Sequence, residues 1–140
     1  MSNPQIIFVP CLILILLTFL VLNIMFNRRM RGLKKGEITP GHFKTYSTGQ
    51  TEAVKTIQAQ RNFSNLQEAP PLFYFLCLIT FVTGNVTPLM MTLAWLFLAS
   101  RIIHTLVHIT TNKLPLRMLS FGAGWLILVL MSINLLIKFI

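Results

Sequence analysis

Three polar residues, Arg61, Asn65 and Glu68, have the types and spacing best suited to binding chemistry in this sequence. Their i, i+4, i+7 spacing places them on one face of a helix. An apolar stretch from Pro70 to Val82 follows directly and has the character of a membrane span. A charged side chain at mid-span costs roughly 2.5 to 3.5 kcal/mol, so such residues normally face a protein interior or a watery cavity and have partners. We therefore expect partners for this stripe elsewhere in the chain.

A second polar set follows later in the sequence. Arg101, His104 and His108 lie at i, i+3, i+7, again on one helical face, and Arg117 comes soon after them. Arginine forks bind carboxylates through paired hydrogen bonds, which a low dielectric strengthens. A ligand with carboxylates and an amine would suit these arginines together with Glu68, and glutathione is an abundant cytosolic molecule of that kind. An arginine near its sulfur would favour the thiolate.

The same residues also have simpler structural interpretations. The stripe from Arg61 to Glu68 can form an ion pair and hydrogen bonds between helices. His104 and His108 can be satisfied core histidines, and two histidines without a third ligand on their face do not predict a metal site. Cys11 and Cys77 are each isolated in an apolar run, which predicts small buried side chains without redox or metal chemistry.

Composition indicates that these residues belong to a membrane protein. Of 140 residues, 54% are hydrophobic and 11% are charged, and the mean hydropathy is +0.71. No ordinary small soluble domain has this composition. Spans of roughly 20 residues are predicted at about 5–27, 53–83, 87–111 and 115–139, provided that the second includes the charged stripe. The predicted fold is an all-α integral membrane protein, a single antiparallel four-transmembrane-helix bundle.

Basic residues predict how the spans are oriented. They gather in or near an expected cytoplasmic loop at about 28–52 and again between the third and fourth spans: Arg28, Arg29, Arg31, Lys34, Lys35, Lys44, Lys55, Lys113 and Arg117. The positive-inside rule then places both termini outside the cytoplasm. Polar groups from all four helices would meet in the cytoplasmic half and form a positively lined pocket. The multi-pass arrangement is compatible with a bacterial inner membrane.

The net charge of +9 does not by itself predict nucleic-acid binding. The aromatic residues lie in the spans and do not alternate with the charges. We expect the basic residues to face the anionic headgroups of the lipid bilayer, and no nucleic-acid partner is predicted.

Two motifs resemble those of the MAPEG family, the membrane-associated proteins in eicosanoid and glutathione metabolism. The first is Arg61-x-x-x-Asn65-x-x-Glu68-x-x-Pro71, which is similar to the helix-two signature of that family. The second is Arg101-x-x-His104-Thr105-x-x-His108 followed by Pro115-x-Arg117, which looks like the pattern of the branch with microsomal glutathione transferases and prostaglandin E synthase. The resemblance extends over nearly the whole chain.

The resemblance implies a role for each polar residue. Arg117 would be the catalytic arginine that stabilises the thiolate, and the glutathione-binding residues would be Arg61, Asn65, Glu68, Arg28, Arg101, His104 and His108. Arg28 stands for a helix-one arginine that could equally be Arg29 or Arg31. Family members are homotrimers with sites between subunits, so Arg117 could serve a neighbour's glutathione. Three positions depart from the prostaglandin branch: Ser64 replaces a second arginine, and His108 and Phe121 replace tyrosines.

The leading functional hypothesis is a glutathione-dependent membrane transferase or peroxidase that acts on a lipophilic electrophile. Because the thiolate would attack directly, no protein nucleophile is needed, in agreement with the isolated cysteines. Two alternatives stay open. One is a small multispan transporter that uses Glu68 as a proton or cation site. The other is a glutathione-binding relative without turnover, which the missing tyrosines allow.

Overall fold

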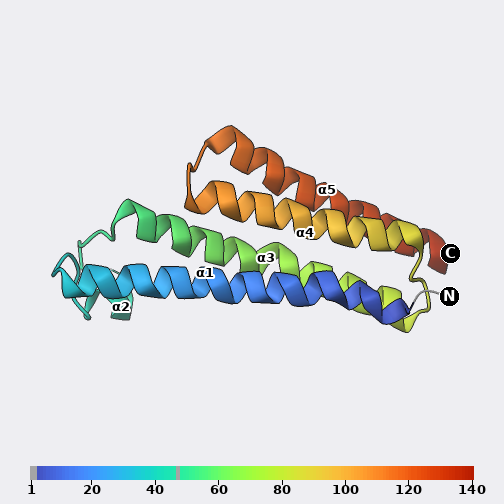
Figure 1. The fold of residues 1–140 in the computed structure, drawn as a ribbon, viewed down its shortest axis with the longest axis horizontal. Coiled ribbons are helices and arrows are strands. Elements are labelled where there is room, and N and C mark those ends of the chain that lie inside the picture. Colours follow the sequence, from blue (N-terminus) through green and yellow to red (C-terminus); the bar gives the residue numbers. More distant parts are fainter. Residues whose placement is uncertain (1–2, 47) are drawn as a thin grey trace.

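The protein is an antiparallel bundle of helices (Figure 1). The structure, a computed structural model, describes residues 3–46 and 48–140. Its elements in chain order are η1 (Pro4–Ile7), α1 (Phe8–Lys34), α2 (His42–Thr45), α3 (Val54–Val82), α4 (Pro88–Ile109) and α5 (Leu114–Phe139). The described residues contain no strand. The four long helices lie side by side with alternating direction, which confirms the predicted all-α four-helix bundle.

The long helices pair as α1 with α3 and α4 with α5, and the two pairs enclose an apolar core (Figure 1). Phe73 and Phe97 are fully buried there and stack with ring centroids 4.5 Å apart. Cys11 and Cys77 are buried as predicted. Their side chains also lie close to each other between α1 and α3, a proximity that their spacing in the sequence does not indicate.

Local sequence explains how the chain turns from α3 into α4. Gly84 has φ of +69°, the left-handed conformation that glycine adopts without a steric cost. The Thr87 hydroxyl then accepts a hydrogen bond of 3.3 Å from the backbone N–H of Met90 and caps α4. Pro88 occupies the first turn, where its missing N–H costs nothing. Local sequence thus accounts for both the turn and the start of α4.

Helix α3 differs in character from the other three long helices. The segments Pro4–Lys34, Pro88–Ile109 and Leu114–Phe139 are long and apolar enough to cross a membrane, whereas α3 does not meet the same criterion. Its first half contains Lys55, Arg61 and Glu68. It nevertheless runs alongside α1 as the fourth helix of the bundle (Figure 1). The charged stripe therefore lies within the length of the bundle.

Two prolines stand inside α3 without ending it. The helix continues through Pro70 and Pro71 to Val82. Proline has no N–H, so the carbonyls of Leu66 and Gln67 lose their usual partners one turn earlier. Such carbonyls are tolerated in membrane helices where neighbouring groups or water satisfy them.

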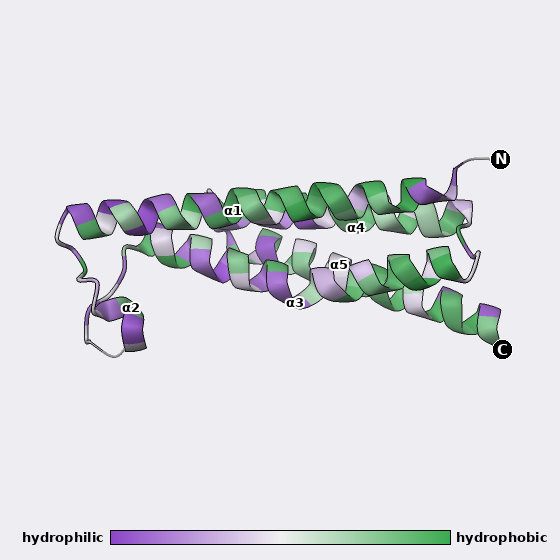
Figure 2. Cartoon of the chain, turned by 90° about the horizontal axis from the view of Figure 1, so that it is seen from below, coloured by the Kyte–Doolittle hydropathy of each residue, from purple (hydrophilic) through white to green (hydrophobic). Residues whose placement is uncertain are grey.

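The expected cytoplasmic loop at 28–52 is more ordered than predicted. Helix α1 continues past residue 27 to Lys34, so the predicted start of this loop is wrong. The polar composition after residue 27 suggested a loop, but helix geometry does not require an apolar sequence once the chain has left the hydrocarbon. Hydrophilic residues gather at this end of α1 and α3 and in α2 (Figure 2). The short helix α2 lies within the remaining connection.

The carboxylate of Glu52 links the segment between α1 and α3 to the end of α1. Glu52 receives hydrogen bonds from Arg29, with Nε–Oε2 at 3.1 Å and Nη2–Oε1 at 3.3 Å. The His42 Nε2 lies 4.0 Å from Oε1 of the same carboxylate. The Arg29 guanidinium also packs over the Phe43 ring at 5.2 Å from its centroid. The Arg29 side chain therefore has a structural role, because it stabilises the connection between α1 and α3.

Candidate functional site

A polar pocket of about 200 Å³ lies where α3, α4 and α5 meet. Asn65 comes from α3, His104 from α4, and Arg117, Met118 and Phe121 come from the first turns of α5. Of the residues predicted for the site, the structure brings together Asn65, His104 and Arg117. They lie in the half of the bundle that contains the α4–α5 turn.

His104 fastens the three helices together. Its Nδ1 lies 3.1 Å from the backbone carbonyl oxygen of Arg117, and its Nε2 lies 3.3 Å from Nδ2 of Asn65. A carbonyl only accepts, so Nδ1 must carry the proton and donate. In the neutral ring Nε2 is then an acceptor and receives a hydrogen from the Asn65 amide. The ring is 3% exposed, so these two bonds replace water that it cannot reach.

Arg117 is held at the mouth of the pocket by the turn that precedes its helix. Its Nη1 donates to Oδ1 of Asn112 at 2.7 Å. Asn112 has φ of +50°, a left-handed conformation that asparagine tolerates better than most residues. A guanidinium carries five N–H donors. Among the described residues, the Arg117 side chain makes no other hydrogen bond, which leaves donors for an anion.

Two of the predicted ligands on α4 are buried away from the pocket lining. Arg101 is 1% exposed and its Nη2 donates to the backbone carbonyls of Ser120 and Phe121, at 3.1 and 2.9 Å. His108 is 2% exposed and stacks edge-on against the His104 ring at 5.5 Å. Neither residue lines the pocket. Their assignment as direct ligands therefore finds no support in the geometry of one chain.

The remaining predicted ligands lie outside the pocket of the single chain. Arg61 and Glu68 are exposed on α3 and make no hydrogen bond or ion pair with the described residues. Around a helix, Arg61 and Glu68 stand about 40° and 60° to one side of Asn65, so α4 covers Asn65 and not the other two. Arg28 donates to the backbone carbonyl of Lys55 and does not reach the pocket.

The charge near the pocket is positive. Both Arg61 and Arg117 lie within electrostatic reach of the His108 ring, and Arg101 is close to His104. No acidic side chain lines the pocket. The arrangement favours an anion, as the sequence predicted. The described residues contain no group of three or more His, Cys, Asp or Glu that could hold a metal ion.

Sequence reasoning missed Asn112 and Met118. Asn112 orients Arg117, and Met118 forms part of the pocket wall. Asn112 precedes Lys113 in the turn, and asparagine at a turn between two helices is the signal that could have drawn attention to it. Nothing in the spacing distinguishes Met118 from the other apolar residues of α5.

The model of the MAPEG family matches residues 7–137, nearly the whole chain. The chain belongs to the MAPEG family. Members of this family use glutathione as a substrate or cofactor, and family membership suggests a glutathione-related transferase or peroxidase function or a role in eicosanoid metabolism. No curated protein matches the chain.

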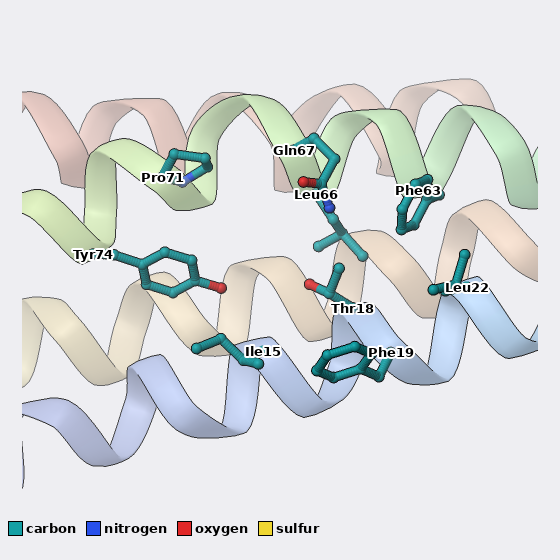
Figure 3. Close-up of a pocket in the computed structure, with 9 residues that line it drawn as sticks. All are labelled: Ile15, Thr18, Phe19, Leu22, Phe63, Leu66, Gln67, Pro71 and Tyr74. Atoms are coloured by element: carbon teal, nitrogen blue, oxygen red, sulfur yellow. The ribbon is translucent and has the colours of Figure 1, made fainter.

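Two apolar cavities of this MAPEG protein open between paired helices. One, of about 420 Å³, lies between α4 and α5 and includes Ser100 and Ser120 in its wall. The other, of about 250 Å³, lies between α1 and α3 (Figure 3). In the second, the hydroxyl groups of Tyr74 and Thr18 point toward each other across an otherwise mostly apolar wall (Figure 3). Both cavities suit apolar molecules from the bilayer.

The hydrogen bonds of His104 predict that two neighbouring histidines differ in their importance. His104→Phe would leave Asn65 Nδ2 without its partner, and an unsatisfied buried group costs about 1 to 3 kcal/mol. The Arg117 carbonyl would lose the bond from His104 and keep the one from the Ser120 hydroxyl. His108→Phe is the matched control, because the Nδ1 of His108 already has no partner. We expect His104→Phe to lower the thermal unfolding midpoint in detergent clearly more than His108→Phe does. Equal effects would show that the His104 bonds contribute nothing.

Proposed function

We propose that the protein is a glutathione-dependent membrane transferase or peroxidase that acts on a lipophilic electrophile. The observation that carries this proposal is the pocket in which Arg117 keeps free donors beside Asn65 and His104. An anion of the size of a thiolate would meet a guanidinium there, beside the buried ring of His104. A charge held in a low dielectric is stabilised more than one in water.

The residues of the pocket fit part of a glutathione molecule. Arg117 would hold the sulfur as a thiolate, while the Oδ1 of Asn65 is free to accept a hydrogen bond because its Nδ2 is bound to His104. When bound, glutathione supplies the nucleophilic sulfur that attacks the electrophile. One chain offers a single cation in the lining of this pocket. The two carboxylates of glutathione therefore require further basic groups.

A neighbouring subunit would supply those groups. Arg61 and Glu68 lie exposed on a helix of the membrane bundle without a partner. Uncovered charges at this depth are costly, so this face of α3 needs a protein or a ligand against it. We assign it to a homotrimer, the assembly that the family resemblance implies. Arg61, Asn65 and Glu68 of one subunit would then face Arg117 of another, with glutathione between them.

The lipophilic substrate would enter from the bilayer. The cavities between α4 and α5 and between α1 and α3 have largely apolar walls and lie within the membrane helices. Apolar side chains there would hold a lipid-like molecule without a loss of hydrogen bonds. The structure thus combines a charged pocket for a water-soluble partner with apolar surfaces for a membrane-soluble one.

The first test uses binding and chemistry together. Glutathione should raise the thermal midpoint of the solubilised protein, with a stabilisation of about 2.7 kcal/mol at a concentration of 100 Kd. Ultraviolet difference spectra should show a bound thiolate. Arg117→Ala should abolish the thiolate signal and lower conjugation by roughly 100-fold or more, as with the loss of one charge-stabilising donor. Lys113→Ala is the matched control, because Lys113 is an exposed cation before the same helix.

The outcomes separate the competing functions. Conjugation that Arg117→Ala leaves unchanged would contradict the proposed mechanism. Glutathione binding without a thiolate or turnover would identify a binding relative. Uptake of a solute into proteoliposomes that Glu68→Gln abolishes, without glutathione binding, would identify a transporter.

The orientation in the membrane is part of the proposal. The end of the bundle that holds α2 is hydrophilic, and the opposite end is more hydrophobic (Figure 2). The end of α1 on the hydrophilic side carries Arg28, Arg29, Arg31 and Lys34. The positive-inside rule then places the pocket toward the cytoplasm and both termini outside, for example in a bacterial inner membrane. A C-terminal fusion of alkaline phosphatase, which is active only outside the cytoplasm, should be active. A fusion after Gly49 should be inactive, and the reverse pattern would overturn the orientation.

A further inference from the structure

Arg101 is a buried cation with no acidic partner. Its side chain is 1% exposed near the middle of α4, and no ion pair among the described residues includes it. A charge in such a position usually either pairs with an acid or serves a function. The contacts of the Arg101 side chain must therefore explain why a charged residue occupies this buried position.

Two of its hydrogen bonds go to the backbone of another helix, and a third goes from Nε to the Ser100 hydroxyl at 3.4 Å. Nη2 donates to the carbonyl of Ser120 at 3.1 Å and to that of Phe121 at 2.9 Å. The guanidinium also lies between two aromatic rings, 5.3 Å from the centroid of Phe97 and 5.5 Å from that of Phe121. Cation–π contacts of this kind strengthen when they are desolvated. Arg101 thus connects α4 to the second turn of α5.

Gly124 provides the space that this arrangement needs. A Cβ atom at position 124 would lie 2.0 Å from Nη2, 2.7 Å from Cζ and 2.9 Å from Nε of Arg101. No real side chain tolerates such distances, so any other residue would displace the guanidinium. Gly122, two positions earlier, has no atom within 4 Å of the corresponding point. The need for glycine is therefore specific to the position that faces Arg101.

Arg101 and His104 hold the same face of α5. His104 Nδ1 donates to the carbonyl of Arg117, and Arg101 donates to those of Ser120 and Phe121. Carbonyls at i, i+3 and i+4 point from one side of a helix. Both pocket residues of α5 that could touch a ligand through charge or an aromatic ring, Arg117 and Phe121, belong to this held segment.

We propose that Arg101, in the space left by Gly124, is a positioning residue that fixes the start of α5 and thereby aims Arg117 and Phe121 into the pocket. It does not touch the ligand. Its Nη2 donates to two backbone carbonyls of α5, whereas its Nη1 has no partner among the described residues. Through Nη2 the residue sets the geometry of the site by way of another helix. The link to chemistry rests on the proposed glutathione function, whereas the contact with Gly124 does not.

A thermodynamic cycle without any ligand tests the contact. Gly124→Ala should lower the thermal midpoint of the solubilised protein by about 5 °C, because overpacking a tight site costs about 1 to 3 kcal/mol. The same change made together with Arg101→Met should cost much less, since the methionine end can move aside. Gly122→Ala is the matched control and should change the midpoint little. If Arg101→Met does not fold, Arg101→Lys replaces it, because a narrow ammonium also leaves room for the added methyl group.

Non-additivity supports the proposal and additivity overturns it. Gly124→Ala should be tolerated only when the guanidinium is gone, as expected for residues in contact. An equal loss in both backgrounds would show that Gly124 is not there to accommodate Arg101. This result is independent of whether the protein binds glutathione.

The positioning role has a spectroscopic readout. Well below the unfolding midpoint and at saturating glutathione, Arg101→Met should reduce the thiolate signal about tenfold, because a small misplacement of Arg117 is costly. The glutathione concentration for half-saturation should change far less, and Arg101→Lys should restore part of the signal. A large rise in that concentration with an unchanged thiolate signal would make Arg101 a ligand and overturn the proposal. If Arg101→Met changed neither the thiolate signal nor the affinity for glutathione, the role of Arg101 would be only structural. This result would also overturn the proposal.

If the wild-type protein gives neither binding nor a thiolate, the proposed function fails. The proposal that Arg101 orients Arg117 toward a ligand then fails as well, because no ligand binds. The cycle at Arg101 and Gly124 still decides whether the guanidinium fixes α5.

Discussion

The need to satisfy buried polar groups in a membrane bundle determines how α4 and α5 are joined. A lone donor or acceptor in hydrocarbon costs several kcal/mol, so a partner on a neighbouring helix stabilises a polar side chain inside the bundle. Arg101 and His104 find theirs in three carbonyls of α5. In the proposed account these bonds hold the start of α5 in place. The position of Arg117 in the pocket would then depend on them.

The same requirement is the reason for the proposal that the charged face of α3 lies at a subunit interface. Within one chain Asn65 is satisfied by His104, whereas Arg61 and Glu68 have no partner among the described residues. Under the proposed function, the bundle supplies half of a site and leaves the complementary charges on the neighbouring, uncovered side of α3. A subunit interface brings such halves together with no new element of the fold.

Much of this architecture could be predicted from the sequence. Apolar length and breaker residues located α3, α4 and α5 closely, because hydrophobic periodicity and capping act locally. The end of α1 could not be placed in the same way. Its last turns are polar, and what orders the following segment is the contact of Arg29 with Glu52, far apart in the sequence.

The site shows the same division between local and distant information. Spacing correctly grouped Arg101 and His104 on one face of a helix, but it could not say which of them meets a pocket and which meets a backbone carbonyl. That difference depends on Gly124, a residue on another helix whose role is visible only when the two are brought together. Likewise the proximity of Cys11 to Cys77 depends on how α1 packs on α3.

The most direct test of the account is an experimental structure of the protein in lipid with glutathione bound. The account predicts a sulfur atom within hydrogen-bonding distance of the Arg117 guanidinium of one subunit. The rest of the molecule should contact Arg61, Asn65 and Glu68 of its neighbour in a trimer. Glutathione bound elsewhere, or a sulfur remote from every Arg117, would contradict it.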